Sequence, residues 1–259
     1  MTELASPLPT TVIAEIMGIP AHRQDDFKRW SDHLVDGLLT GGSTIKMAAS
    51  ALEIVTFFAT IVKQRRRQPS DDLVSLLVTG DDDSALNTPE LVAFSVLLLV
   101  AGNETTTNLT SNTMLALFDW PDLCQQLQAD PTLAAAAIEE TLRFDGPGQG
   151  LLRATTTNVE IANATIPVES RVMAMIASAN RDPRHWEDPD TFRLDRDLNG
   201  HLAFGSGIHY CIGNTLARLE GRVAIETIFR RMPDIRPAGQ PTRINSPVLR
   251  GLRSLPVTI

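Results

Sequence analysis

The chain has 259 residues, of which 43% are hydrophobic and 21% are charged, and its formal net charge at pH 7 is −8. This composition is typical of a globular protein with enough chain to bury a sizeable core. The acidic balance argues against nucleic-acid binding, which usually needs a basic surface stripe.

The first part of the chain predicts a series of helices with apolar residues at helical spacing. A short helical segment runs from Thr10 to Met17, and Gly18 and Pro20 close it. Further helices are expected over residues 22–39, 45–67 and 73–78. The run Arg65 to Arg67 ends the longest of these, as suits the negative end of a helix dipole. An acidic loop is expected from Gly80 to Asn87.

A nearly all-apolar helix is predicted from Thr88 to about Phe118. Thr88 and Pro89 mark its start, because a capping hydroxyl followed by proline is typical of a first helical turn. A helix that is apolar on almost all sides is usually buried. Polar residues between Asn103 and Thr107 interrupt the pattern in its middle. Two more helices follow, over residues 119–129 and 131–143.

After Gly146 the pattern changes to short alternating segments rich in β-branched residues, with turns between them. Strands are expected at residues 151–156, 159–161, 165–166 and 171–175. Residues 180–196 are rich in Pro, Asp and Arg and predict little regular structure. A glycine-rich loop from Phe204 to Gly213 then precedes a last helix, about Thr215 to Arg231, and the tail returns to short strands.

These elements predict a mainly α protein with a minor β portion, an α+β fold. We expect a single domain over residues 1–259, mainly helical in 1–145. Residues 146–259 then hold the β-rich segment, the irregular stretch, the cysteine loop and the last helix.

Neither a membrane span nor a disulfide framework is expected. The N-terminus lacks the basic and apolar regions of a signal peptide. The longest apolar run, Leu91 to Ala101, is too short to cross a bilayer. The two cysteines, Cys124 and Cys211, form no CxxC pair. This cysteine usage fits a reducing cytoplasm.

The strongest candidate site is the loop FGSGIHYCIG at residues 204–213. Cys211 stands just before a helix, where backbone N–H groups and the helix dipole stabilise a thiolate. Glycines at 205, 207 and 213 let the backbone pass close to a flat ligand and donate N–H groups to the sulfur. The alternative is that Cys211 is a small buried hydrophobe after a glycine-rich turn.

The loop resembles the haem-binding FxxGxxxCxG pattern of the cytochromes P450, with every fixed position filled. The resemblance implies haem b as the cofactor, with Cys211 as the thiolate ligand of the iron. It also implies that Phe204, Gly205, His209 and Gly213 help to bind the cofactor, with His209 at a haem propionate. Within Leu151 to Ala154, Arg153 resembles a second propionate contact, because its guanidinium fork fits a carboxylate.

A second motif pairs Glu140 with Arg143 on one helix face, where residues three apart can form an ion pair. Alone it carries little information, because such surface pairs are common and weak. Its place before the β region and the cysteine loop resembles the ExxR motif of the P450s. The resemblance implies a structural role in which the pair binds an arginine of the later irregular stretch. Arg193 and Arg196 are the candidates, with His185 as a weaker one.

A third motif, AGNETT at residues 101–106, resembles the AGxET(T) of the distal P450 helix. The resemblance implies that Ala101 and Gly102 lie over the haem and that Glu104 and Thr105 form an acid–alcohol pair. Such a pair delivers protons by general acid catalysis. A threonine hydroxyl that bonds back to the preceding turn can widen a helix locally. The alternative is a helix–helix contact that small polar residues complete, since buried polar groups need partners.

The resemblance extends from about Pro9 to the end, with ANRDP at residues 179–183 and HLAFG at 201–205, and is that of soluble bacterial members. Compared with them, the chain lacks the N-terminal part, which carries further propionate contacts and the roof of the substrate pocket. Apolar faces would then be bare, which predicts an oligomer or a partner chain that covers them.

The leading functional hypothesis is a haem-thiolate monooxygenase that oxidises a small apolar molecule with O2 and two electrons. A ferredoxin or similar donor would supply the electrons, and basic residues such as Arg218 and Arg222 could attract it, unless they form a solvated face. Apolar pocket lining is expected from Leu97, Leu98, Ala101, Gly148, Gln149 and Leu151. The alternatives are a catalytically impaired haem-binding or accessory protein, and an inactive fragment.

Overall fold

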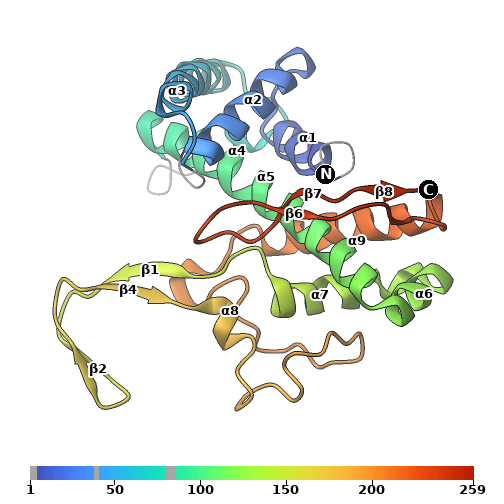
Figure 1. Cartoon of the computed structure of the whole chain (residues 1–259). Helices are drawn as coiled ribbons and strands as arrows, with labels where there is room; N and C mark the ends of the chain where they lie inside the picture. Colours follow the sequence, from blue (N-terminus) through green and yellow to red (C-terminus); the bar gives the residue numbers. More distant parts are fainter. Residues whose placement is uncertain (1–4, 38–40, 80–85) are drawn as a thin grey trace. The chain divides into compact units, whose positions relative to one another are not determined.

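The computed structural model of the chain describes residues 5–37, 41–79 and 86–259. The predicted acidic loop over Gly80–Asn87 therefore lies almost entirely outside the described residues. The chain divides into two compact units, residues 1–108 and 109–259. The long helix α5 (Thr88–Asp119) contributes to both units (Figure 1). That the two units act as one domain stays a prediction.

The first unit is built from helices. They are α1 (Pro7–Ile16), α2 (Gln24–Val35), α3 (Thr44–Arg67), α4 (Leu73–Val78) and the first part of α5, with a 3-10 turn at Ala21–Arg23. Helix α2 packs against both α1 and α3. The core between these helices contains fully buried side chains, namely Ala14, Phe27, Trp30, Ile54 and Phe58.

The arginines in the last turn of α3 lie at the negative end of the helix dipole, and two of them also bind other residues of the first unit. Arg65 lies 2.5 Å from the carboxylate of Asp72, which is almost fully buried and caps α4 by accepting a hydrogen bond from the Ser75 N–H at 2.7 Å. Arg66 donates to the Thr88 hydroxyl at 2.6 Å. The arginine run therefore joins α3 to the starts of α4 and α5.

Helix α3 is long and apolar enough to cross a membrane by length and composition alone. A single helix of this kind is weak evidence for a membrane span, because helices in protein cores meet the same criterion. In this structure α3 buries one face, with Ile54, Phe58, Ile61 and Val62. Its other side exposes Ile45 and Leu52.

The second unit holds the end of α5 and the helices α6 (Pro121–Ala129), α7 (Ala134–Asp145), α8 (Ile176–Ala179) and α9 (Asn214–Arg231). Two 3-10 turns lie at Pro131–Leu133 and Gly207–His209. Helices α7 and α9 pack against each other. Gly221 permits this contact, because a Cβ there would lie 2.8 Å from the Ile138 side chain.

The strands of the second unit form four antiparallel pairs. They are β1 (Leu151–Ala154) with β4 (Arg171–Ala174), β2 (Val159–Ile161) with β3 (Ala164–Ile166), β5 (Arg236–Pro237) with β8 (Val257–Thr258), and β6 (Thr242–Arg243) with β7 (Leu252–Ser254). In the first pair Arg153 lies opposite Val172. Figure 1 shows this pair and the β2 hairpin continuing as one arm.

The fold is mainly α with minor β structure, as the sequence predicts. Helix α4 has the predicted bounds, and α3, α5 and α9 begin and end within one residue of them. Helix α8, a single turn between β4 and the irregular stretch, was not predicted from the sequence. Residues 22–39 were predicted as one helix, whereas α2 begins only at Gln24, after a 3-10 turn. It ends at Val35, a π-helical turn follows at residues 36–37, and residues 38–39 lie outside the described residues.

Candidate functional site

The backbone of Cys211 is held on both sides. Its N–H donates to the carbonyl of Phe204 at 2.9 Å, which closes the loop on itself. Its own carbonyl accepts hydrogen bonds from the backbone N–H and the side-chain Nδ2 of Asn214, at 3.3 and 2.8 Å. The thiol is half-buried and free. It stands three residues before α9, an 18-residue helix whose N-terminal dipole favours a thiolate.

The glycines of the loop differ in what they do. Gly205 and Gly207 adopt φ of +74° and +67°, a left-handed conformation that other residues rarely adopt. Gly213 has an ordinary φ of −84°, and a Cβ there would lie 4.0 Å from the Cys211 sulfur. The first two glycines therefore shape the loop, whereas Gly213 leaves open space next to the sulfur.

Two residues predicted to contact a cofactor, Arg153 and His209, are exposed in the second unit. Arg153 lies in β1 and donates only to the carbonyl of its neighbour Leu152, at 2.9 Å. His209 lies in the 3-10 turn of the cysteine loop. Within the described part of the chain neither residue forms an ion pair with a carboxylate. Both are therefore available to an anionic ligand.

The cysteine loop also exposes apolar side chains. Ile208 is 98% exposed and Ile212 is 78% exposed, and Tyr210 is about half exposed. These residues flank Cys211 in sequence, so the thiol lies in an apolar, accessible stretch of the surface. Such a patch usually marks a contact with a ligand or partner.

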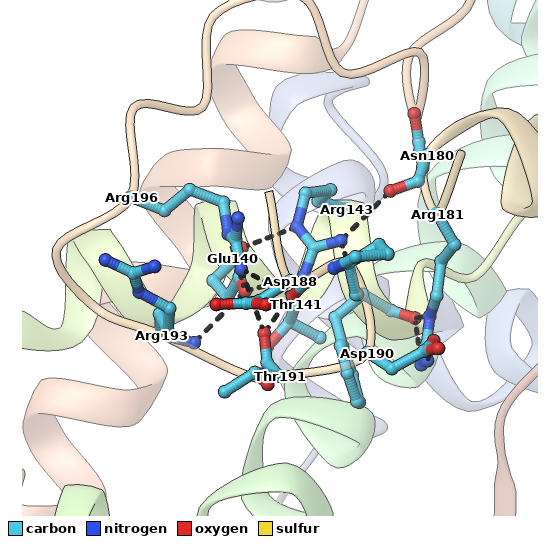
Figure 2. A network of polar contacts seen from close by, with 12 residues as sticks. Glu140, Thr141, Arg143, Asn180, Arg181, Asp188, Asp190, Thr191, Arg193 and Arg196 are labelled. Atoms are coloured by element: carbon cyan, nitrogen blue, oxygen red, sulfur yellow. Dashed lines mark hydrogen bonds and ion pairs between the residues drawn. The ribbon is translucent and has the colours of Figure 1, made fainter. Parts of the chain in front are cut away.

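Glu140 and Arg143 of α7 form a buried pair, as their spacing predicts (Figure 2). Arg143 donates from Nε and Nη2 to the two carboxylate oxygens of Glu140, at 2.8 and 2.7 Å. The same guanidinium donates to backbone carbonyls of the irregular stretch, those of Asn180, Pro189 and Thr191. The pair therefore holds that stretch against α7.

The two candidate arginines of the irregular stretch contact Glu140 in different ways. Arg196 directs its guanidinium at Glu140, with Nε 3.3 Å from Oε1, and its side chain is 6% exposed. Arg193 uses its backbone N–H for Glu140 and pairs its side chain with Asp195. Arg196 is thus the side-chain partner of the pair, as Figure 2 shows. The weaker candidate, His185, packs edge-on against Trp186.

The third motif lies in the first unit, on α5. Glu104 is largely buried and accepts a hydrogen bond from Asn108 Nδ2 at 3.2 Å. Burial raises the pKa of Glu104 above its ordinary value, and the negative charge of Asp32 acts in the same direction. Thr105 donates its hydroxyl proton to the Ala101 carbonyl at 2.6 Å, the back-bond that the sequence analysis expects.

The N-terminal half of α5 exposes a stripe at four-residue spacing, formed by Ala93, Leu97 and Ala101. Leu97 is 59% exposed. The stripe continues toward Thr105, and Gly102 lies beside it. The prediction that this helix is buried throughout is therefore wrong for this half, because its apolar residues also form a face that no described residue of the first unit covers.

Two residues in these motifs were not singled out from the sequence. Asn214 fixes the Cys211 carbonyl, and a polar residue at the start of the last helix was the available signal. Asn180 accepts the Leu202 N–H on its side-chain Oδ1, at 2.7 Å. It thereby joins the irregular stretch to the segment before the cysteine loop, although it lies 31 residues before Cys211 in sequence.

The comparisons with known proteins agree with this arrangement of motifs. The family described as Cytochrome P450 matches residues 11–251. The chain belongs to the cytochrome P450 family.

Among similar P450s, cytochrome P450 107B1 of Saccharopolyspora erythraea is 41% identical over 98% of this chain and 63% of the relative. Vitamin D(3) 25-hydroxylase of Pseudonocardia autotrophica is 40% identical over all of this chain and 65% of the relative. The crystal structure of CYP109E1 from Bacillus megaterium in complex with corticosterone matches with a TM-score of 0.92 and 35% identity, over 99% of this chain and 70% of that one. This chain therefore spans about two thirds of the length of such P450s.

The residues present fit the haem of this family. Among the described residues no group of three or more His, Cys, Asp or Glu side chains could hold a bare metal ion. A lone thiol in a glycine-shaped loop suits an iron that brings its other ligands in a porphyrin. A Cβ at Gly213 would lie 4.0 Å from the Cys211 sulfur, so the glycine leaves room there for a flat group, and the exposed side chains of Arg153 and His209 can bind anionic substituents.

Proposed function

We propose that this chain binds haem b through the thiolate of Cys211 and takes part in the monooxygenation of a small, largely apolar molecule. The observation that carries the proposal is the Cys211 loop, in which both backbone groups of the cysteine are fixed, Gly205 and Gly207 shape the loop, and Gly213 leaves open space next to the sulfur. When bound, haem with a thiolate ligand supplies the chemistry that cleaves the O–O bond.

The residues of the second unit would hold the cofactor. Cys211 would ligate the iron, and Arg153 and His209 would each neutralise a propionate, since both are exposed and form no ion pair with a carboxylate among the described residues. Phe204, Gly205 and Gly213 would shape the surface against which the porphyrin lies. The buried pair of Glu140 and Arg143 would keep this framework rigid.

The residues of α5 would handle protons and substrate, and Ala101 and Gly102 would help to bind the cofactor. A carboxyl with a raised pKa keeps its proton to higher pH, so Glu104 would be a suitable proton donor. Thr105 donates its hydroxyl proton to the Ala101 carbonyl, so its hydroxyl oxygen can still accept a hydrogen bond from another donor. The stripe of Ala93, Leu97 and Ala101 would offer an apolar surface to the substrate.

The substrate class and the electron donor are part of the proposal. One relative is named for vitamin D(3) and one solved neighbour contains corticosterone, and the apolar stripe suits molecules of comparable polarity. A ferredoxin or similar protein would supply the two electrons, in the cytoplasm. Arg222 is the more accessible of the two arginines considered for docking, since Arg218 is bound to Glu139. We propose no nucleic-acid or membrane partner.

A second candidate function is that of a haem-binding or accessory protein without turnover, or of an inactive fragment. The observation in its favour is the exposure of apolar residues next to Cys211, which a partner chain could cover. An oligomer or a second chain would then cover apolar residues such as Ile208 and Ile212, and sedimentation of the purified protein would reveal it.

The absorption spectrum of the reduced, CO-exposed protein tests the proposal. We expect the strongly red-shifted Soret band of a haem-thiolate, and its loss in Cys211→Ser. Cys124→Ser is the matched control, because Cys124 is buried in α6 and its substitution should leave the band in place. A band typical of a neutral ligand, or no haem band, would contradict ligation by Cys211. Turnover with an electron donor or added peroxide would then separate the enzyme from an accessory protein.

A further inference from the structure

Arg218 of α9 is bound inside the second unit rather than free for docking. Its Nε donates to Glu139 Oε1 at 2.6 Å and its Nη2 to Glu139 Oε2 at 3.3 Å, which joins α9 to α7. Its side chain is 33% exposed. A two-pronged contact of this kind fixes the orientation of a guanidinium as well as its position.

The same guanidinium reaches the cysteine loop by two routes. Its Nη1 donates to Asn214 Oδ1 at 2.9 Å, and the Nδ2 of Asn214 donates to the Cys211 carbonyl at 2.8 Å. Its carbon Cζ lies 4.4 Å from the centre of the Phe204 ring, a cation–π contact. The Phe204 carbonyl in turn accepts the Cys211 N–H. Arg218 therefore supports the backbone on both sides of the cysteine.

His201 completes the group on the other side of Glu139. Its Nε2 lies 3.1 Å from Glu139 Oε2, and its Nδ1 accepts the Ala203 N–H at 3.2 Å. Since Nδ1 accepts, its proton is assigned to Nε2, which donates to the carboxylate. The His201 side chain is 4% exposed. His201 therefore helps to hold Glu139 in place through this hydrogen bond.

Glu139 and Arg218 are both ionised in this arrangement. Burial alone would raise the pKa of Glu139, but the hydrogen bonds from His201 and Arg218 outweigh it and lower the pKa. Burial alone would lower the pKa of Arg218, but hydrogen bonds to Glu139 and Tyr210 outweigh it and raise the pKa. The positive charge of Arg218 and the negative charge of Glu139 thus lie close together next to the Cys211 loop.

We propose that Glu139, Arg218 and His201 are positioning residues for the haem ligand, which fix the Cys211 loop through Asn214 and Phe204 and set the charge behind it. The part of this inference that concerns charge rests on the proposed haem-thiolate function. The mechanical part concerns the loop itself and holds with or without the cofactor.

Hydrogen exchange of the haem-free protein tests the mechanical part. The Cys211 amide is protected by its hydrogen bond to Phe204, so its exchange reports how firmly the loop is held. We expect Arg218→Gln to accelerate exchange in residues 204–214 about tenfold, because it removes charge-assisted bonds to two partners. Arg222→Gln is the matched control, four residues along α9, with its guanidinium 3.9 Å from Glu226. Equal exchange in both variants would overturn the proposal.

The midpoint potential of the haem-loaded protein tests the electrostatic part. Glu139→Gln leaves the Arg218 charge uncompensated, which favours the reduced iron and raises the potential. Arg218→Gln leaves Glu139 uncompensated and lowers the potential. Arg218→Lys keeps the charge without the fork or the ring contact, so it should loosen the loop and leave the potential near that of the parent. Shifts of the same sign in the two Gln variants, or no shift, would overturn the electrostatic part.

The two measurements separate this inference from the proposed function. A parent protein that takes up no haem would contradict the proposed function, while exchange in the loop would still decide the mechanical part. A parent with the expected Soret band and no effect of Arg218→Gln on exchange or potential would contradict only the positioning network.

Discussion

Glu140 and Arg143 face each other one turn apart on α7 through two hydrogen bonds of 2.8 and 2.7 Å, and both side chains are wholly excluded from solvent. A buried pair of this kind does not by itself add much stability, because both charges lose their hydration. Removing Arg143 is costly, because Glu140 stays buried and keeps only the longer contact with Arg196, at 3.3 Å. The remaining donors of Arg143 hold the carbonyls of the irregular stretch, so its loss would release that stretch as well.

We predict that Arg143→Ala lowers the free energy of unfolding by about 3–5 kcal/mol, because buried Glu140 loses its two-pronged partner and keeps only the longer contact with Arg196, while three backbone carbonyls lose their donor. Urea denaturation followed by circular dichroism measures this. Arg193→Ala is the control, with an expected loss below about 1 kcal/mol, because its side chain is about one third exposed and its one ion pair among the described residues is with the exposed Asp195. Similar losses in the two variants would contradict the assignment.

The choice between Arg193 and Arg196 shows where prediction from the sequence ends. Glu140 and Arg143 lie on a helix, so their spacing alone places them on one face. The stretch that carries the two arginines has no periodicity, and the direction of each side chain depends on backbone contacts such as that of Arg143 with Thr191. Long elements were predicted well for the converse reason, since their caps and periodicity are local.

Burial along α5 is another property that the sequence did not determine. Its apolar residues predict a buried helix, yet Leu97 is 59% exposed, because periodicity gives the polarity of a face and not what covers it. The hydrogen bonds of the Asn103 side chain were not predicted for a related reason. Asn103 lies in the AGNETT motif, where roles were assigned to its neighbours, and its partners Ser31 and Thr10 lie 72 and 93 residues away in the sequence.

Asn103 joins three helices of the first unit through a buried polar cluster. Its Oδ1 accepts the Thr10 hydroxyl of α1 at 2.8 Å, and its Nδ2 donates to the Ser31 hydroxyl of α2 at 2.7 Å. We predict that Asn103→Leu lowers the free energy of unfolding by about 2–4 kcal/mol, because both hydroxyls lose a buried partner. Thr56→Ala is a control near zero, because that hydroxyl is exposed and bonds only to the Leu52 carbonyl. A loss below 1 kcal/mol in Asn103→Leu would show that the cluster is dispensable.

Gly18 ends α1 in a conformation and a space that suit only glycine. Its φ is +65°, and a Cβ there would lie 2.2 Å from the Asp72 carboxylate, which also binds Arg65 and caps α4. We predict that Gly18→Ala costs about 2–4 kcal/mol, since it adds a clash with a fixed side chain to the left-handed strain. Gly41→Ala is matched, with φ of +76° and open space, and should cost only about 1 kcal/mol. Thermal melts of the two variants measure the two losses of stability. Equal losses would show that the clash with Asp72 adds nothing to the left-handed strain.

Glu220 of α9 is a buried carboxylate whose Oε2 has no hydrogen-bond partner in the described part of the chain. Glu220 is buried, with 6% of the residue exposed, and this burial raises the pKa of its carboxyl to about 7. In the unfolded chain a glutamate titrates at about 4.3. The folded state therefore binds this proton more tightly, and the carboxyl lowers stability as the pH rises from about 4.3 to about 7.

We predict that Glu220→Gln removes this loss, because an amide carries no charge to bury. At pH 8 the variant should exceed the parent in free energy of unfolding by about 3–4 kcal/mol, and at pH 4 the two should be nearly equal. Urea denaturation at a series of pH values between 4 and 8 measures the difference. Glu160→Gln in the exposed β2 hairpin is the control and should give a difference that varies little with pH. A Glu220→Gln difference that is flat with pH would show that Glu220 is ionised at little cost in the folded protein, and so that a partner or water reaches its carboxylate.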